Sequence, residues 1–115
     1  MTQISALINS ERLPLKILNL RGNQLRDKGV EALYLGLIAR DDIEFLDLSF
    51  CKVTDVGFLK VVEFLRFNKS LKVLYLMGNR ITGKGIESLD KCWQTDLEHS
   101  VLEILKIGEI VDCTP

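Results

Sequence analysis

The segment Gly78–Gly85 is the part of this sequence whose residue types and spacing come closest to a chemical site. It contains the GxxxxGK core of a phosphate-binding loop, and it follows an expected strand and precedes an expected helix. Position 85 is glycine, however, where such a loop needs a serine or threonine hydroxyl to hold magnesium. The segments Gly22–Gly29 and Phe50–Gly57 have the same layout without a Gly-Lys pair. We therefore interpret Gly78–Gly85 as a structural turn and expect no nucleotide and no other cofactor.

Other residues with catalytic or metal-binding potential are isolated from one another. His99 is the only histidine, and no serine or cysteine is placed to act as its nucleophile. The three cysteines show neither CxxC nor Cys/His spacing, which argues against zinc. A Cys92–Cys113 disulfide is one alternative, but reduced thiols are favoured because the N-terminus lacks a secretory signal. The sequence thus predicts no enzyme, no catalytic residue and no metal site.

The balance of charge excludes several classes of partner. Fifteen Lys and Arg residues stand against sixteen Asp and Glu, and the two signs are interspersed along the chain. A surface for nucleic acid or anionic lipid would need a basic excess. No stretch approaches the roughly 20 apolar residues of a membrane span. We therefore expect a cytoplasmic protein that binds neither nucleic acid nor membrane.

One motif occurs three times, in repeats that start near residues 15, 43 and 71, 28 positions apart. Each copy contains two leucines separated by one residue, so both leucines share one face of a short strand. An Asn or Cys follows three residues later, where an inward side chain can satisfy backbone groups of the neighbouring coil. The paired leucines are Leu18 and Leu20, Leu46 and Leu48, and Leu74 and Leu76; the bend residues are Asn23, Cys51 and Asn79.

This LxxLxLxxN/CxL pattern at a fixed period resembles the leucine-rich repeat, in the longer form typified by ribonuclease inhibitor. The resemblance extends over about residues 15–108. It implies an α/β solenoid, a short horseshoe with a parallel β-sheet on the concave face and helices on the convex face. We expect residues 1–115 to form a single leucine-rich repeat domain.

The second half of each repeat has the spacing of an amphipathic helix. The apolar stripes are Val30, Leu33 and Leu37; Phe58, Val61 and Leu65; and Ile86, Leu89 and Trp93. Gly29, Gly57 and Gly85 stand in register before these stripes, which predicts that each helix start packs closely against the adjacent coil. Thr54 and Thr82 are predicted helix N-caps, and Asp27 is the candidate cap in the first repeat.

Both ends of the array are imperfect. Residues 1–14 resemble the end of a preceding helix, and a degenerate terminal strand is expected at 102–108. That strand begins 31 residues after Leu71, so the third helical segment should carry about three extra residues. Neither end resembles a dedicated cap, and an uncovered solenoid end exposes apolar surface. We therefore expect self-association, or contact with another subunit, through the ends.

The resemblance implies two classes of function. The first is a scaffold or interaction module that binds a partner protein through its concave face. The alternative is a regulatory subunit similar to the Ran GTPase-activating protein, for which Asn79-Arg80 is a suggestive pair that also fits the ordinary repeat motif. No catalytic residue can be transferred from that family, and the fold by itself does not decide between the two classes.

Strand residues that face away from the core are the predicted partner-binding surface. The first column holds Ile17, Phe45, Val73 and Ile104; the second holds Asn19, Asp47, Tyr75 and Lys106; the third holds Arg21, Ser49 and Met77. The first column is entirely apolar, whereas a solvated sheet face would favour polar residues. Two interpretations are open: the side chains cover one another on a tight face, or they form an exposed stripe of the kind that marks protein interfaces.

Overall fold

The computed structural model describes residues 14–95 and 102–108 of the 115-residue chain. Strands and helices alternate within these ranges, as the repeat predicts. The strands are β1 (Ile17–Asn19), β2 (Phe45–Asp47), β3 (Val73–Tyr75) and β4 (Ile104–Lys106). The helices are α2 (Arg26–Leu37), α3 (Asp55–Phe67) and α4 (Gly83–Thr95).

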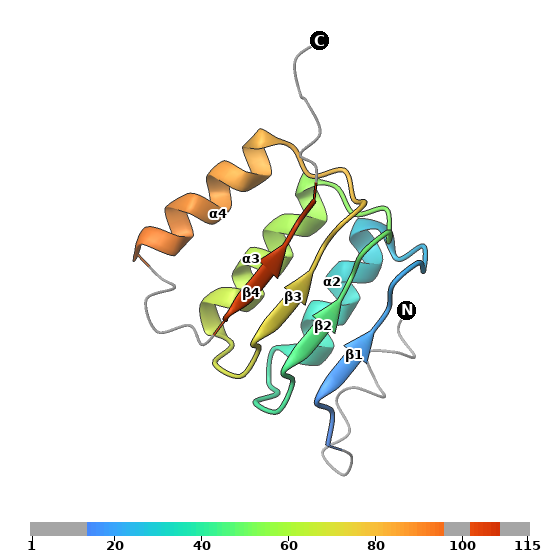
Figure 1. The fold of residues 1–115 in the computed structure, drawn as a ribbon, viewed down its shortest axis with the longest axis vertical. Coiled ribbons are helices and arrows are strands. Elements are labelled where there is room, and N and C mark those ends of the chain that lie inside the picture. Colours follow the sequence, from blue (N-terminus) through green and yellow to red (C-terminus); the bar gives the residue numbers. More distant parts are fainter. Residues whose placement is uncertain (1–13, 96–101, 109–115) are drawn as a thin grey trace.

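The four strands form one parallel sheet in the order β1-β2-β3-β4. The helices cover one face of this sheet and leave the other face open (Figure 1). Ile17, Phe45 and Val73 lie in register across the strands, as the 28-residue alignment requires, and Ile104 continues the row with an offset of 31 residues. The predicted α/β leucine-rich repeat solenoid is therefore confirmed, and β4 confirms the terminal strand expected at 102–108.

The core lies between the sheet and the helices. The paired leucines of β2 and β3 and of the turns that follow are buried, namely Leu46, Leu48, Leu74 and Leu76. Each contributes about 1.5–3 kcal/mol through removal of its side chain from water. Leu18 and Leu20 of the outermost repeat are only half-buried, since no described residue covers them from the other side. Burial thus comes from stacking, because one strand-turn-helix unit cannot enclose its own apolar face.

Asn79 joins the second and third coils through three hydrogen bonds and makes a fourth within its own coil. Its Oδ1 accepts from the backbone N–H groups of Cys51 and Val53, both at 3.0 Å. Its Nδ2 donates to the carbonyl oxygens of Leu48 at 2.9 Å and Leu76 at 3.0 Å. The amide is buried with its donors and acceptors all used, which confirms the predicted role of the bend residue.

Cys51 performs the same role one repeat earlier with fewer bonds. Its buried Sγ donates to the carbonyl oxygen of Leu20 at 3.1 Å. Burial raises the pKa of the Cys51 thiol, which favours this protonated donor form. Asn23, at the first bend, is exposed, and its Nδ2 donates to the same carbonyl of Leu20, within its own coil.

The helix starts are capped by the preceding repeat as well as by their own residues. Both carboxylate oxygens of Asp27 are used: Oδ1 accepts from Thr54 N at 2.8 Å and Gly57 N at 3.0 Å, and Oδ2 accepts from Thr54 Oγ1 at 2.5 Å. The prediction that Asp27 caps its own helix is wrong, because α2 follows Leu25 without any side-chain cap. Thr54 is confirmed as the cap of α3, and its Oγ1 accepts from Val56 N.

Asp55 repeats the arrangement for α4. Its carboxylate accepts from Thr82 N at 2.8 Å and forms a short hydrogen bond with the Thr82 hydroxyl. Thr82 in turn accepts from Lys84 N at 3.2 Å, as expected for a cap. Gly83 occupies the same column as Asp27 and Asp55 but offers no carboxylate.

The glycines at the helix starts leave room for these aspartates. A Cβ at Gly57 would lie 2.5 Å from Asp27 Oδ1, and a Cβ at Gly85 would lie 2.5 Å from Asp55 Oδ1. Such distances are far below van der Waals contact. The predicted close packing of helix starts against the neighbouring coil is therefore confirmed at both positions.

One expectation about α4 is wrong. Trp93 is exposed, and the packed face instead uses Leu89 and Cys92. Successive residues of an α-helix are about 100° apart, so Cys92 lies on the packed face, although the i, i+3, i+7 spacing predicted its neighbour Trp93 there. The expectation of about three extra residues in this helical segment falls beyond Thr95, outside the described residues.

Several predictions fall on residues outside the described ranges. They are the partial helix expected over residues 1–14, of which only Pro14 is described, the environment of His99, and the Cys92–Cys113 disulfide. Cys51 is a free cysteine. Within residues 14–95 and 102–108, no helix has both the length and the apolar run needed to cross a bilayer.

The turn before β2 contains an ion pair that should make stability depend on pH. Asp42 Oδ1 accepts from Arg40 Nε at 2.9 Å, and Asp42 Oδ2 accepts from Arg40 Nη2 at 2.6 Å and Leu15 N at 2.7 Å. These bonds, with Arg40 the largest cause, lower the pKa of Asp42 from 3.8 to about 2. The folded-state pKa of Asp42 lies below the unfolded value. The contribution of the ionised Asp42 carboxylate to folding stability is therefore complete above about pH 4 and is lost as pH falls towards 2.

We expect the Asp42→Asn variant to lose less stability than the wild type between pH 5 and pH 2.5. The Asp42 side chain is 34% exposed, so solvent screening limits the difference to about 1 kcal/mol. Urea unfolding at both pH values measures this difference in the free energy of unfolding. Asp41→Asn, at the exposed neighbouring position, is the control, and equal acid sensitivity of wild type and Asp42→Asn would contradict the assignment.

Candidate protein-binding surface

The open face of the sheet carries the apolar column that the sequence predicts. Ile17 and Ile104 at its ends are 67% and 41% exposed, while Phe45 and Val73 between them are half-buried. None of the four belongs to the core cluster beneath the sheet. The side chains thus shield one another only in part, and a continuous apolar stripe faces solvent across all four strands.

Two aromatic side chains meet at the middle of this stripe. The rings of Phe45 and Tyr75 lie edge to face, with centroids 5.4 Å apart and planes at 82°. On the far side, Lys106 Nζ lies 5.6 Å from the centre of the Tyr75 ring. Edge-to-face packing restrains both rings on this face.

Asp47 and Ser49 were predicted on this face but have structural roles, since they are only 4% and 0% exposed. Asp47 Oδ1 accepts from Ser49 N at 2.9 Å, and Ser49 Oγ accepts from Met77 N at 3.1 Å. Short polar side chains at strand ends bond readily to nearby backbone, which draws them inward. Asp47 also lies 4.0 Å from a guanidinium nitrogen of Arg21.

The remaining predicted positions are placed along the same face and its rim. Asn19, Arg21 and Lys106 are exposed, and Met77 is half-buried. Asn19 Oδ1 accepts from Arg21 N at 3.0 Å, so it repeats the turn that Asp47 makes in the next strand. The structure therefore brings an apolar stripe, an aromatic pair and two exposed cations together on one face.

Sequence reasoning did not single out Phe50. This residue follows β2 and is 50% exposed, and the Arg21 guanidinium carbon lies 4.8 Å from the centre of its ring. Phe50 has a φ of 57°, in the left-handed region that bulky residues avoid. Its alignment with Gly22 and Gly78 was a readable signal, because both glycines adopt the same positive φ.

Three backbone N–H groups of the phosphate-loop lookalike already have hydrogen-bond partners. The amide nitrogen of Arg80 donates to Val53 O, that of Thr82 to Asp55 and that of Lys84 to Thr82 Oγ1. These are groups that a phosphate would need. The geometry therefore supports the interpretation of Gly78–Gly85 as a repeat turn.

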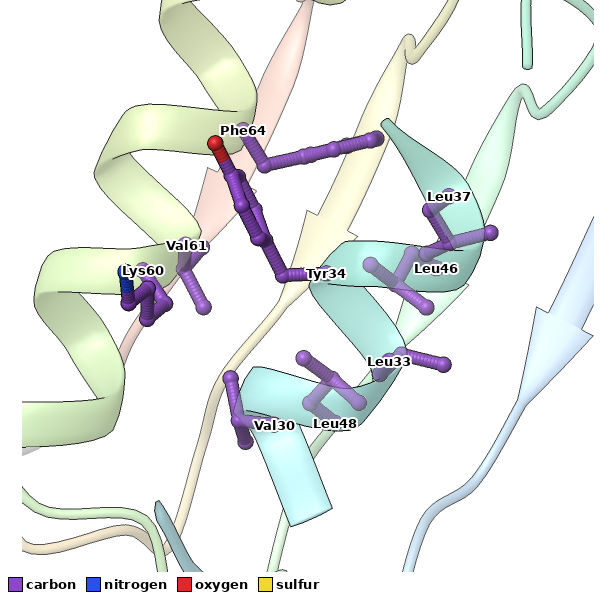
Figure 2. Close-up of a pocket in the computed structure, with 9 residues that line it drawn as sticks. All are labelled: Val30, Leu33, Tyr34, Leu37, Leu46, Leu48, Lys60, Val61 and Phe64. Atoms are coloured by element: carbon purple, nitrogen blue, oxygen red, sulfur yellow. The ribbon is translucent and has the colours of Figure 1, made fainter. Parts of the chain in front are cut away.

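The small pocket between α2, α3 and the sheet is lined largely by core residues (Figure 2). Its apolar lining includes Val30, Leu48 and Phe64, and its volume of about 10 Å³ is marginal even for one water molecule. Tyr34 reaches from α2 towards α3, where Lys60 Nζ lies 5.3 Å from its ring centre. The described part of the chain contains no group of three or more His, Cys, Asp or Glu residues placed to hold a metal.

Two solved structures show the same fold at low sequence identity. The first is described as the tropomodulin C-terminal domain from Caenorhabditis elegans, with a TM-score of 0.76, 17% identity and coverage of 90% of this chain and 61% of that one. The second is described as leiomodin-1 actin-binding site 2, with a TM-score of 0.78, 18% identity and coverage of 99% and 64%. The chain thus spans less than two thirds of either structure's length.

The sequence itself identifies the family. No curated protein resembles it closely enough to count as a match. The family profile described as Leucine Rich repeat, by contrast, matches residues 14–33, 42–61 and 67–89, which together make up more than half of the chain. These segments correspond to the three strand-turn-helix units described above. The chain belongs to the leucine-rich repeat family.

Proposed function

We propose that this protein is a non-enzymatic interaction module that binds a partner protein through its concave sheet face. The observation that carries the proposal is the apolar stripe of Ile17, Phe45, Val73 and Ile104, with Tyr75 packed beside it. Contiguous exposed apolar surface commonly marks an interface, and aromatic residues are enriched among those that carry binding energy.

Actin is the first partner to test. One of the two solved structures is described as an actin-binding site, which supports this choice, although the likeness itself is one of fold. A cytoplasmic location, where actin is abundant, is part of the proposal. So is membership of the ribonuclease-inhibitor-like subfamily, which the 28-residue period with a helix in each repeat supports.

Replacing Phe45 and Tyr75 together with Ser is expected to weaken partner binding by about 30- to 100-fold, in line with the loss of one or two hot-spot residues. Both side chains lie outside the core cluster, so the fold should persist. Co-sedimentation with actin filaments and isothermal titration with actin monomers measure the change, and circular dichroism checks the fold.

The matched control replaces two exposed apolar residues on the helical face, Val56 and Leu59, with Ser. This variant removes a similar apolar surface from the opposite side and should bind as the wild type does. If the concave variant is folded and retains full affinity while the control loses it, the helical face is the binding surface. If actin does not bind, the same pair of variants applies to whichever protein the wild type captures.

The alternative of a GTPase-activating subunit gains no specific support from the site. In the suggestive Asn-Arg pair, Asn79 is buried and uses its amide in three bonds to the preceding repeat and one within its own. Association through the ends remains a proposal, supported by the half-buried state of Leu18, Leu20 and Leu105 on the outer strands.

A further inference from the structure

The loops that follow β1, β2 and β3, with the first residues of the helices after them, lie along one edge of the sheet (Figure 1). These three segments, residues 20–28, 48–56 and 76–84, are joined by backbone bonds such as Arg26 N to Cys51 O at 2.9 Å and Arg80 N to Val53 O at 2.8 Å. Every Lys and Arg in them is exposed. We call these residues the basic rim: Arg21, Arg26, Lys28, Lys52, Arg80 and Lys84.

The same segments contain only two acidic residues, so they offset two of the six positive charges. Asp27 and Asp55 are half-buried, and both carboxylates bond to the next repeat. The net charge of −1 conceals the segregation, because residues 28 positions apart in sequence become neighbours only when the repeats stack. Lys84, which completes the phosphate-loop lookalike, belongs to this rim.

Phe50 stands among these cations in a conformation that suits glycine. Gly22, Phe50 and Gly78 share one column and have φ values of 80°, 57° and 71°. A bulky residue in the left-handed region costs free energy, and such strain is a reason to look for function. The ring is held in place: Arg21 lies over it, and a Cβ at Gly78 would come within 2.2 Å of Phe50 Cδ1.

We propose that the basic rim docks an acidic protein segment that also carries apolar side chains, with Phe50 as the aromatic anchor. Complementary charge supplies the attraction, and the exposed ring supplies a desolvated contact. The proposal rests on the proposed function as an interaction module and specifies the chemistry of the partner. A single-stranded nucleic acid is disfavoured, because Arg21 and Gly78 occupy the surroundings of the ring on which a base would have to stack.

The test measures fluorescence anisotropy of a short labelled peptide of alternating Glu and Leu with the full chain at low salt. We expect binding that weakens as salt is raised to about 0.5 M. Lys52→Glu/Arg80→Glu should lower the affinity by at least about 10-fold. The control Lys16→Glu/Lys69→Glu changes the net charge equally, at exposed positions on the opposite edge, and should change affinity less than about 2-fold.

A second variant separates the anchor from the charge. Phe50→Gly installs the residue that the neighbouring repeats use, so the melting temperature should stay the same or rise. Affinity for the peptide should fall by about 10-fold. Phe45→Ser/Tyr75→Ser should leave peptide binding unchanged, so that failure of the concave-face proposal and failure of the rim proposal give different results.

Five results would overturn the proposal. Three of them are absence of peptide binding at low salt, equal losses in the two charge-reversal variants, and full affinity of a folded Phe50→Gly variant. The fourth is tighter binding of a short oligouridine with the same dependence on Lys52 and Arg80, which would make the rim a nucleic-acid surface. The fifth is loss of peptide binding in Phe45→Ser/Tyr75→Ser, which would place the peptide on the concave face instead.

Discussion

Asp27→Ala is expected to lower the free energy of unfolding by about 3 kcal/mol. The substitution removes a carboxylate that accepts three hydrogen bonds, from Thr54 N, Thr54 Oγ1 and Gly57 N. Two of these donors are backbone N–H groups at the start of α3, which has few other partners for them. Bonds to an ionised acceptor are stronger than neutral ones, and leaving partly buried donors unpaired adds a desolvation cost.

Urea unfolding followed by circular dichroism measures this change. Asp41→Ala, which removes an exposed carboxylate from a turn, is the control and should cost less than about 0.5 kcal/mol. Asp27→Asn should be intermediate, because the amide oxygen can still accept from the backbone. Equal stability of Asp27→Ala and Asp41→Ala would show that the bonds between repeats contribute little.

Gly57→Ala is expected to destabilise the protein by about 2 kcal/mol or more, although alanine is the better helix former by about 1 kcal/mol. The new Cβ would lie 2.5 Å from Asp27 Oδ1 and 3.0 Å from Val53 Cγ1, so the aspartate cap and the adjacent coil would have to move apart. The sign of the effect is thus opposite to the one that helix propensity predicts.

Gly83 provides the matched control within the same protein. It is the first residue of α4, it is exposed, and a Cβ placed there would meet nothing within 4 Å. Gly83→Ala should therefore be neutral or stabilising by up to about 1 kcal/mol. Thermal unfolding of the two variants compares them directly. A stabilising effect at both glycines would mean that the coils are packed less closely than the structure indicates.

The architecture could be predicted from the sequence because the same strand-turn-helix motif occurs three times. Leucines two apart specify a strand with one buried face, and the same bend residue and glycine recur at fixed distances. The strand register followed directly from the 28-residue alignment, and so did the stripe through Phe45 and Val73. These features depend on periodicity, which is present in the sequence itself.

Features that depend on contact between repeats could not be read in the same way. Asp27 looks like a cap for its own helix, and only the stacked structure shows that it caps the next one. The alternation of the strand residues predicts that Asp47 and Ser49 point outward, yet both side chains accept hydrogen bonds from backbone N–H groups and are buried. The cations of the basic rim are distant in sequence, so neither net charge nor local charge density reveals them.

The central claim is that the concave stripe is the partner-binding surface, and site-specific photocrosslinking tests it most directly. A benzoylphenylalanine placed at Phe45 or Tyr75 replaces one aromatic ring with another and reports which molecule lies against it. The account predicts a crosslinked partner from both concave positions and none from Leu59, an exposed residue on the helical face. Crosslinks from Leu59 alone, with none from Phe45 or Tyr75, would contradict it.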